Sequence, residues 1–202
     1  MRHTYTVKTF DGQPLEAVLD ETGMLFISGP GRKEEWLSPG DVPWKDERGQ
    51  IRAVRFADDV QVQDLTNWFW GCGHLEEIAN WPESVVRMQA TCCDCHRLAK
   101  LPPAFPAGLR DLDEAFIRCY ALTSVPEIPV GVEYATDTFV DCFALSGHVA
   151  LRGAPAQFAF LFQNAGRDGD GIVVDYAPSC ESVIDELIAT KGDGNVKKGK
   201  LL

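Results

Sequence analysis

Apolar residues recur along the middle of the chain in a four-slot pattern, in which each slot lies three residues after the last. The cysteine slots of four successive copies are 23, 24 and 23 residues apart. The copies are Phe69-x-x-Cys72-x-x-Leu75-x-x-Ile78, Cys92-x-x-Cys95-x-x-Leu98-x-x-Leu101, Phe116-x-x-Cys119-x-x-Leu122-x-x-Val125 and Phe139-x-x-Cys142-x-x-Leu145-x-x-His148. Partial copies occur at Ile51-x-x-Val54 and Phe162-x-x-Ala165. The pattern predicts a solenoid, because each coil must bury its apolar face against its neighbours.

The pattern also predicts the path of each coil. The step from the leucine slot to the last apolar slot suits one short strand of a parallel sheet. Pro102 and Pro126 follow two of these strands, and proline stops a ladder where the chain must turn. Segments 83–92, 108–116 and 131–139 predict the return path, as irregular or short helical turns. His148 puts a polar residue in an apolar slot, so we expect the regular stack to end near it.

The flanking segments differ from the repeat and predict caps. Residues 1–50 predict an N-terminal β cap with strands at 4–10, 14–19 and 24–28, and the repeats occupy residues 51–168. In residues 169–202 we expect a strand at 172–176, an amphipathic capping helix at 178–189 and a tail at 196–202 that is an edge strand or disordered. The predicted fold class is therefore an α/β solenoid of about five coils that behaves as one cooperative unit.

The repeat resembles a known family most strongly at Glu114-Ala-Phe-Ile-Arg-Cys-Tyr-Ala-Leu-Thr-Ser-Val-Pro126. This segment is similar to the unit of the BspA-type leucine-rich repeat family, and residues 18–31, Trp44 and residues 51–56 resemble the leader before such repeats. The resemblance covers about residues 18–168. It implies a right-handed curved solenoid of bacterial cell-surface or phage-associated proteins, with adhesion or host-protein binding as its function.

Composition and charge restrict the classes of molecule that the chain is expected to bind. The 202 residues carry a formal net charge of −11, which repels nucleic acid and anionic lipid. No apolar run approaches the roughly 20 residues that span a bilayer. Residues 1–10 carry no apolar secretion signal, so the chain reads as cytoplasmic, whereas the family resemblance implies the cell surface. We expect a protein partner, either a host protein or a second copy of the chain, without nucleic acid or membrane insertion.

The cysteines and acidic turns are candidates for chemistry. Four of the seven cysteines occupy one repeat slot, which predicts buried reduced thiols. Cys92-x-x-Cys95 is an alternative zinc or redox pair, but the chain has no second such pair. His74, His96 and His148 lie at different offsets in their coils, so they form no column of bases for a cysteine nucleophile. Segment 168–171 resembles part of a calcium loop, although a turn explains it more simply. We therefore expect a non-enzymatic protein without cofactor or metal.

The polar residues between the apolar slots are the best candidates for a contact surface, and the alternative is a solvated face that binds no ligand. Exposed aromatic residues at its margin, among them Phe105, are expected to anchor a partner. Trp68 and Trp70 flank Phe69, and we expect the outward-facing set to pack under the N-terminal cap, with a sticky surface patch as the alternative. The alternative function is a structural component of a larger, phage-like assembly. The candidate binding residues are Arg52, Glu76, Glu77, Asn80, Trp81, Lys100, Thr123, Ser124 and Ser146.

Overall fold

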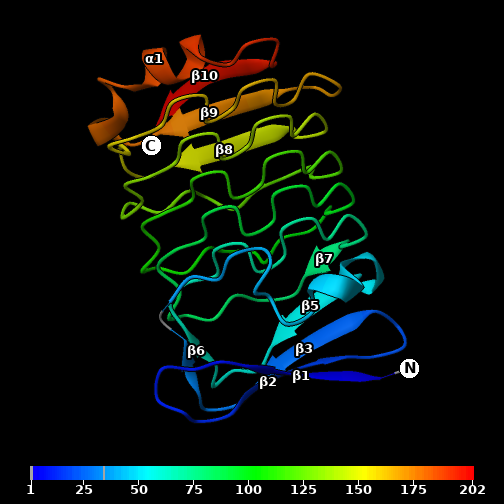
Figure 1. Cartoon of the computed structure of the whole chain (residues 1–202). Coiled ribbons are helices and arrows are strands. Elements are labelled where there is room, and N and C mark those ends of the chain that lie inside the picture. Colours follow the sequence, from blue (N-terminus) through cyan, green and yellow to red (C-terminus); the bar gives the residue numbers. More distant parts are fainter. Residues whose placement is uncertain (1, 34) are drawn as a thin grey trace.

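A computed structural model describes residues 2–33 and 35–202, and it shows a stack of coils running from the N-terminal sheet to the C-terminal strands (Figure 1). The five-stranded sheet has the order β1-β2-β3-β5-β7, the three-stranded sheet the order β10-β9-β8, and β4 pairs with β6. The elements are β1 (His3–Val7), β2 (Leu15–Leu19), β3 (Met24–Ser28), β4 (Arg32–Lys33), η1 (Lys45–Gln50), β5 (Ala53–Phe56), β6 (Gln61–Val62), β7 (Glu77–Ile78), β8 (Gly147–Leu151), β9 (Ile172–Tyr176), η2 (Pro178–Cys180), α1 (Ile184–Ala189) and β10 (Val196–Leu201).

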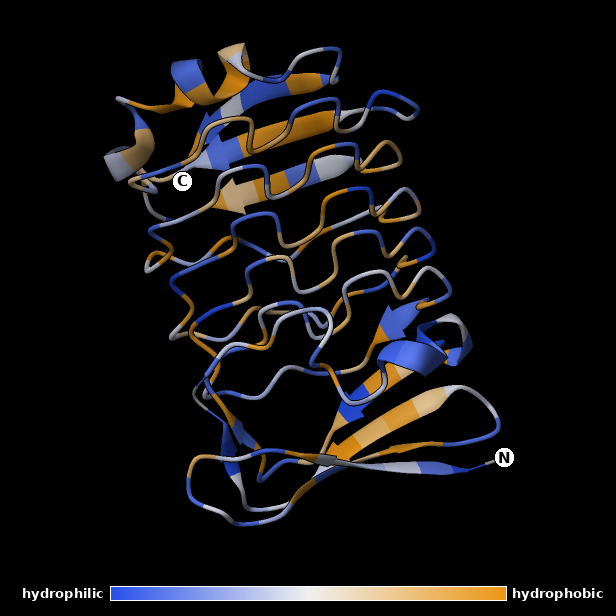
Figure 2. Cartoon of the chain, viewed as in Figure 1, coloured by the Kyte–Doolittle hydropathy of each residue, from blue (hydrophilic) through white to orange (hydrophobic). Residues whose placement is uncertain are grey.

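The N-terminal segment forms three strands close to the predicted ones, although the strand expected at 4–10 already ends at Val7. Strands β1, β2 and β3 follow one another as an antiparallel meander, and β3 then pairs in parallel with β5, Leu25 opposite Val54. Strand β3 is largely hydrophobic and β1 more polar, which matches their places inside and at the edge of the sheet (Figure 2). The sheet hydrogen bonds cross the predicted boundary at residue 50. Our division into residues 1–50, 51–168 and 169–202 remains a prediction.

The coils are joined by ladders of backbone hydrogen bonds on two sides. On one side, Glu77 forms parallel bridges with both Ala53 and Lys100. On the other side, single-residue parallel bridges run through five successive coils at Asp64, Arg87, Asp111, Tyr134 and Gln157. The apolar slots lie between the two sides, and the Phe, Cys and Leu slots of the repeat are fully buried. The solenoid predicted from the period is therefore confirmed, but it has about seven turns rather than the five coils that we expected.

The cysteine column is held by bonds between coils. All seven cysteines are free and buried. The thiols of Cys95, Cys119 and Cys142 each donate to the backbone carbonyl of the first slot one coil earlier, across 3.1, 3.2 and 3.1 Å. A thiol is small enough for this bend and satisfies a carbonyl that an aliphatic side chain would leave unpaired. The slot therefore uses cysteine as a packing residue, as the repeat predicted.

The turn between the two ladders contains no helix, so the α/β assignment was wrong. Each coil places two residues in the left-handed region, four positions apart, as Ala90 and Asp94 with φ of 49° and 64°. Alternate N–H groups then donate to the next coil: Ala90 to Asp113, Cys92 to Ala115 and Asp94 to Ile117. These bonds remove the donors that an α-helix needs for its own carbonyls. The protein is a β-solenoid with little helix.

The stack does not end at His148, contrary to our expectation. Gly147 has a φ of 86°, a conformation that favours glycine, and it turns the chain so that Val149 and Leu151 face the core. His148 points outward, with 67% of its side chain exposed, and its Nδ1 lies 2.8 Å from Asp175 Oδ2. Strand β8 then pairs along its whole length with β9. One glycine thus accommodates the polar residue without interrupting the ladder.

The C-terminal end differs from the predicted helical cap. Strand β9 occupies the predicted residues, but the helix expected at 178–189 consists of a 3-10 turn, η2, and the six-residue α1. The chain then returns as β10, which pairs in parallel with β9 and settles the tail as an edge strand. Ile184 and Leu187 of α1 are fully buried against this end. The last coil is therefore completed by a strand, and α1 is part of its return path.

Aromatic residues join the N-terminal cap to the first repeats, as predicted. Trp44 lies edge-on to Trp68 with ring centroids 5.6 Å apart, and its indole N–H donates to the Trp68 carbonyl across 3.0 Å. Arg48 lies over the Trp70 ring at 5.4 Å. Trp68 and Phe69 are both fully buried although they are neighbours, because the chain turns at Asn67 (φ 63°) rather than running extended.

Among the described residues, no helix is long and apolar enough to cross a membrane.

Candidate functional site

Seven of the predicted contact residues lie on neighbouring coils of the β5–β7–β8 side, and we call this set the polar strip. Backbone bonds fix the spacing of the coils: Glu76 N–H donates to the Arg52 carbonyl across 2.7 Å, and Ser146 N–H donates to the Thr123 carbonyl across 3.0 Å. Six of the residues are exposed and Ser146 is half-buried. The polar strip consists of Arg52, Glu76, Glu77, Lys100, Thr123, Ser124 and Ser146.

Charges on the polar strip are paired between coils. Arg52 Nη1 lies 3.3 Å from Glu76 Oε1, and Lys100 Nζ lies 3.8 Å from Glu77 Oε2. All four side chains are about half exposed or more, so each pair contributes at most about 1 kcal/mol to stability. Such weak pairs exchange readily for contacts with a partner. The other end of the strip is neutral and presents hydroxyl groups.

A shallow hollow lies on the charged part of the polar strip. It has a volume of about 380 Å³ and is lined by Glu76, Glu77, Arg97, Ala99, Lys100 and Ala121. Both signs of charge therefore surround a small apolar floor provided by two alanines. This arrangement suits a polar side chain of a partner protein that carries its own donors and acceptors.

Asn80, another predicted contact residue, is half-buried. Its amide nitrogen donates to the Phe56 carbonyl and its amide oxygen accepts from the Phe56 N–H, both across 3.0 Å. Strand β7 pairs with β5 only at Ala53 and Val54, so the Asn80 side chain takes the place of a backbone partner for Phe56. The predicted contact role of Asn80 remains a prediction, but its amide is already engaged within the protein.

Asn80→Ala is expected to lower the free energy of unfolding by about 1–3 kcal/mol, because the half-buried Phe56 N–H and C=O both lose their partner. Urea-induced unfolding followed by circular dichroism measures this change. Thr123→Ala is the control, since its side chain is exposed, and we expect a change within about 0.5 kcal/mol. Equal changes in the two variants would contradict the bridging role of Asn80.

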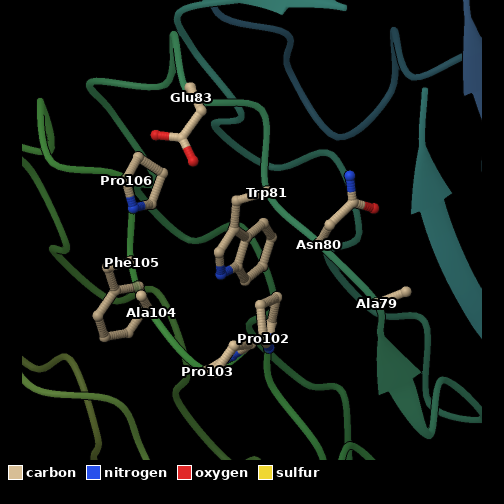
Figure 3. A pocket seen from close by; sticks show the side chains of 9 residues that line it. All are labelled: Ala79, Asn80, Trp81, Glu83, Pro102, Pro103, Ala104, Phe105 and Pro106. Atoms are coloured by element: carbon tan, nitrogen blue, oxygen red, sulfur yellow. The ribbon is translucent and has the colours of Figure 1, made fainter. Parts of the chain in front are cut away.

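Trp81 and Phe105 are each only 6% exposed, so our expectation of exposed aromatic anchors was wrong for both. They line a pocket of about 350 Å³ together with Pro102, Pro103 and Pro106 (Figure 3). The proline-rich turn at 102–106 lies beside the tryptophan (Figure 3). Trp81 Nε1 is buried without a hydrogen-bond partner among the described residues. Leaving a buried donor unpaired costs about 1–3 kcal/mol.

A ladder of stacked rings lies one residue after the cysteine slot, and we did not anticipate it. His96 and Tyr120 have ring centroids 4.9 Å apart, and Tyr120 and Phe143 lie 5.2 Å apart, with nearly parallel rings in both pairs. Arg167 covers the end, with its guanidinium carbon 3.7 Å from the Phe143 centroid. The sequence signal was available, because these residues are 24 and 23 positions apart. Their faces contact one another, so mainly their edges are open to a partner.

Beside this ladder, Arg118 holds Asp94 by two hydrogen bonds, one of them from Nη2 to Oδ2 across 2.8 Å. These bonds lower the pKa of Asp94, whereas burial raises the pKa of the neighbouring Cys93 thiol to about 12. Burial also raises the pKa of Cys92, the opposite of what a nucleophile or metal ligand needs. Across residues 2–33 and 35–202, no group of three or more His, Cys, Asp or Glu side chains is arranged to hold a metal ion.

Comparison with known proteins gives one structural similarity. No family model matches the chain, and no curated protein matches it. Among solved structures, the chain is similar to the crystal structure of a leucine-rich repeat protein from Eubacterium ventriosum ATCC 27560, with 12% sequence identity and a TM-score of 0.41. The match covers 88% of this chain and 66% of that protein, so the chain spans just under two thirds of the length of its neighbour. The solenoid fold is shown by the ladders of bonds between the coils.

Proposed function

We propose that the chain is a non-enzymatic protein-interaction module that binds its partner through the polar strip. The observation that carries this proposal is the fixed placement of exposed side chains by backbone bonds between coils, such as Glu76 N–H to Arg52 and Ala99 N–H to Glu76. A surface that is already ordered loses little conformational entropy on binding. The half-exposed ion pairs and the adjacent hollow supply polar contacts for a partner of mixed charge.

The finer proposal is adhesion or host-protein binding by a BspA-type leucine-rich repeat. Its support is the resemblance of segment 114–126 and of the leader residues to that family. The alternative is a structural component of a phage-like assembly that contacts further copies of the chain. The outer edge of β10 gives this alternative little support for end-to-end growth, because Lys197, Lys198 and Lys200 are exposed there and charged residues oppose pairing of edge strands.

Capture on the immobilised domain tests the proposal. We expect a protein from extracellular host material or lysate to be retained by the native domain and lost when Glu76, Glu77, Lys100 and Thr123 are all replaced by alanine. The variant is expected to fold, because its ion pairs contribute little to stability. Mass spectrometry identifies the retained protein, and its purified form then confirms binding by titration.

A domain with Glu181→Ala and Glu186→Ala is the matched control, since it removes exposed charge at the opposite end of the stack. Equal retention by the native domain and the strip variant would place the binding face elsewhere. If the domain retains only itself, and light scattering after gel filtration shows oligomers rather than a 22.3 kDa monomer, the assembly alternative replaces the proposal.

A further inference from the structure

The pocket around Trp81 is formed by corresponding turns of two successive coils. One turn supplies Ala79, Asn80, Trp81 and Glu83, and the next supplies Pro102 to Pro106 (Figure 3). The volume of about 350 Å³ is at the lower end of the range for ligand sites in proteins. Trp81 lies in the middle of the lining residues, so its indole forms the floor of the pocket.

The polar group at the floor of the pocket is the Trp81 indole N–H, a hydrogen-bond donor. An indole N–H donates and accepts nothing, and the Trp81 N–H has no partner among the described residues. Figure 3 shows its nitrogen-bearing edge directed toward the side of the pocket where Ala104 and Phe105 lie. A ligand that fits this pocket must therefore bring a hydrogen-bond acceptor to that side.

The walls restrict the ligand further. Three of the nine lining residues are proline, two are alanine and one is phenylalanine. An ordinary peptide brings an N–H beside each carbonyl, and this donor would be buried against apolar side chains. A proline residue has no N–H, and a polyproline II segment leaves its carbonyls free to accept. Aromatic-lined grooves recognise such segments because they lose little entropy on binding.

A negative charge lies at the edge of the pocket. Glu83 lines the pocket and is exposed, and it forms no ion pair with any described residue. The net charge of −11 attracts a cationic partner toward the whole chain. A lysine or arginine beside the proline segment therefore finds an unpaired carboxylate at the edge of the pocket.

We propose that this pocket binds a proline-containing extended segment of a partner protein, with one of its carbonyls accepting from Trp81 Nε1 and a flanking basic residue contacting Glu83. The proposal deepens the proposed function and depends on it, because it assigns a second contact beside the polar strip. It commits to a polyproline II peptide, so a helical partner segment or a small molecule is an outcome that the experiment distinguishes.

The probe is a capped nonapeptide, Arg-Ala-Pro-Pro-Leu-Pro-Pro-Ala-Arg, titrated into the full chain by calorimetry and by NMR of the tryptophan indole N–H signals. We expect saturable binding that shifts the Trp81 signal, and about fivefold to tenfold weaker binding by Trp81→Phe, which keeps an aromatic ring without the donor. Glu83→Gln is expected to weaken binding and reduce its salt dependence. Trp36→Phe is the matched control, because Trp36 is 62% exposed and does not line this pocket.

A second variant keeps the test valid if Trp81→Phe is unstable. Ala104 is exposed at the pocket, so Ala104→Leu fills the space without disturbing the core, and we expect it to abolish binding. The proposal is overturned if the peptide does not bind, if a peptide with serine in place of each proline binds equally, or if both pocket variants bind as tightly as the native chain. Partner capture that still depends on the polar strip would then leave the proposed function intact.

Discussion

Phe116→Ala is expected to lower the free energy of unfolding by about 3–5 kcal/mol, the usual cost of removing a buried phenylalanine. The Phe116 ring is fully buried and stacks on Phe139 with centroids 5.6 Å apart, and Phe139 stacks on Phe162 at 5.5 Å. Backbone bonds between coils fix the spacing of these rings, so the neighbours cannot move together to fill the cavity. Urea-induced unfolding measured by circular dichroism gives the change.

Phe160→Ala is the control, because it removes the same side chain from a position that is 44% exposed. We expect a change within about 0.5 kcal/mol. A loss for Phe116→Ala as small as that of the control would show that the phenylalanine ladder does not hold the coils together. Two separate transitions in either protein would contradict the prediction that residues 1–202 unfold as one cooperative unit.

The repeat could be predicted because its signal comes from burial. A slot such as Cys119 contacts the equivalent slots one coil before and after it, so the same small or aromatic residue types suit every copy. The period therefore appears in the sequence directly, and the slots of the core follow from it. The strand at 172–176 was also predictable, because its apolar run has the length and β-branched composition of a buried strand.

The turns could not be predicted from residue types. Glu114 and Arg118 adopt φ of 58°, a region that non-glycine residues rarely visit. Their N–H groups donate to Thr136 and Val140 in the next coil, so the ladder outweighs the local preference of each residue. A helical return path was a reasonable expectation from propensity alone, but propensity is a local property and this ladder is not.

The candidate site was predictable in its placement but not in its contacts. The period places Glu76 and Lys100 on the exposed face, whereas it does not reveal that Asn80 bonds to Phe56 or that Trp81 is covered. Both outcomes depend on neighbouring turns that lie about 24 residues away in the sequence. Side-chain contacts between coils need the register of the coils, and the period fixes that register only for the core slots.

We expect the protein to unfold in alkaline solution, because its buried thiols must keep their protons in the folded state. Burial raises the pKa of Cys72, Cys92, Cys119 and Cys142. In the unfolded chain these thiols ionise near a pH of about 8.5, whereas in the folded chain they keep their protons. Their contribution to stability is therefore fully present below about pH 8.5 and is lost as the pH rises toward the folded pKa. Ionisation in the unfolded chain lowers the stability by about 1.4 kcal/mol per pH unit for each thiol in this range, or roughly 5.5 kcal/mol per pH unit for the four together.

An ordinary protein has a free energy of unfolding of about 5–15 kcal/mol. At a loss of roughly 5.5 kcal/mol per pH unit, this stability is used up about one to three pH units above the thiol pKa of the unfolded chain, and we expect the protein to unfold there. Circular dichroism between pH 7 and pH 11, with a reducing agent present, measures the transition. Urea titrations at intermediate pH values give the slope itself.

Cys142→Ala separates the thiol effect from other groups that titrate in the same range. Alanine suits the slot, since Ala165 occupies it one coil later and is fully buried. The variant loses the bond from Cys142 to the Phe116 carbonyl, so we expect it to be less stable than the native protein at pH 7 by about 1 kcal/mol. Above about pH 8.5 this difference shrinks by about 1.4 kcal/mol per pH unit, and the two stability curves cross. Val149→Ala removes a buried side chain that does not titrate, so its curve stays parallel to the native one. A parallel curve for Cys142→Ala as well would show that the buried thiol does not oppose ionisation.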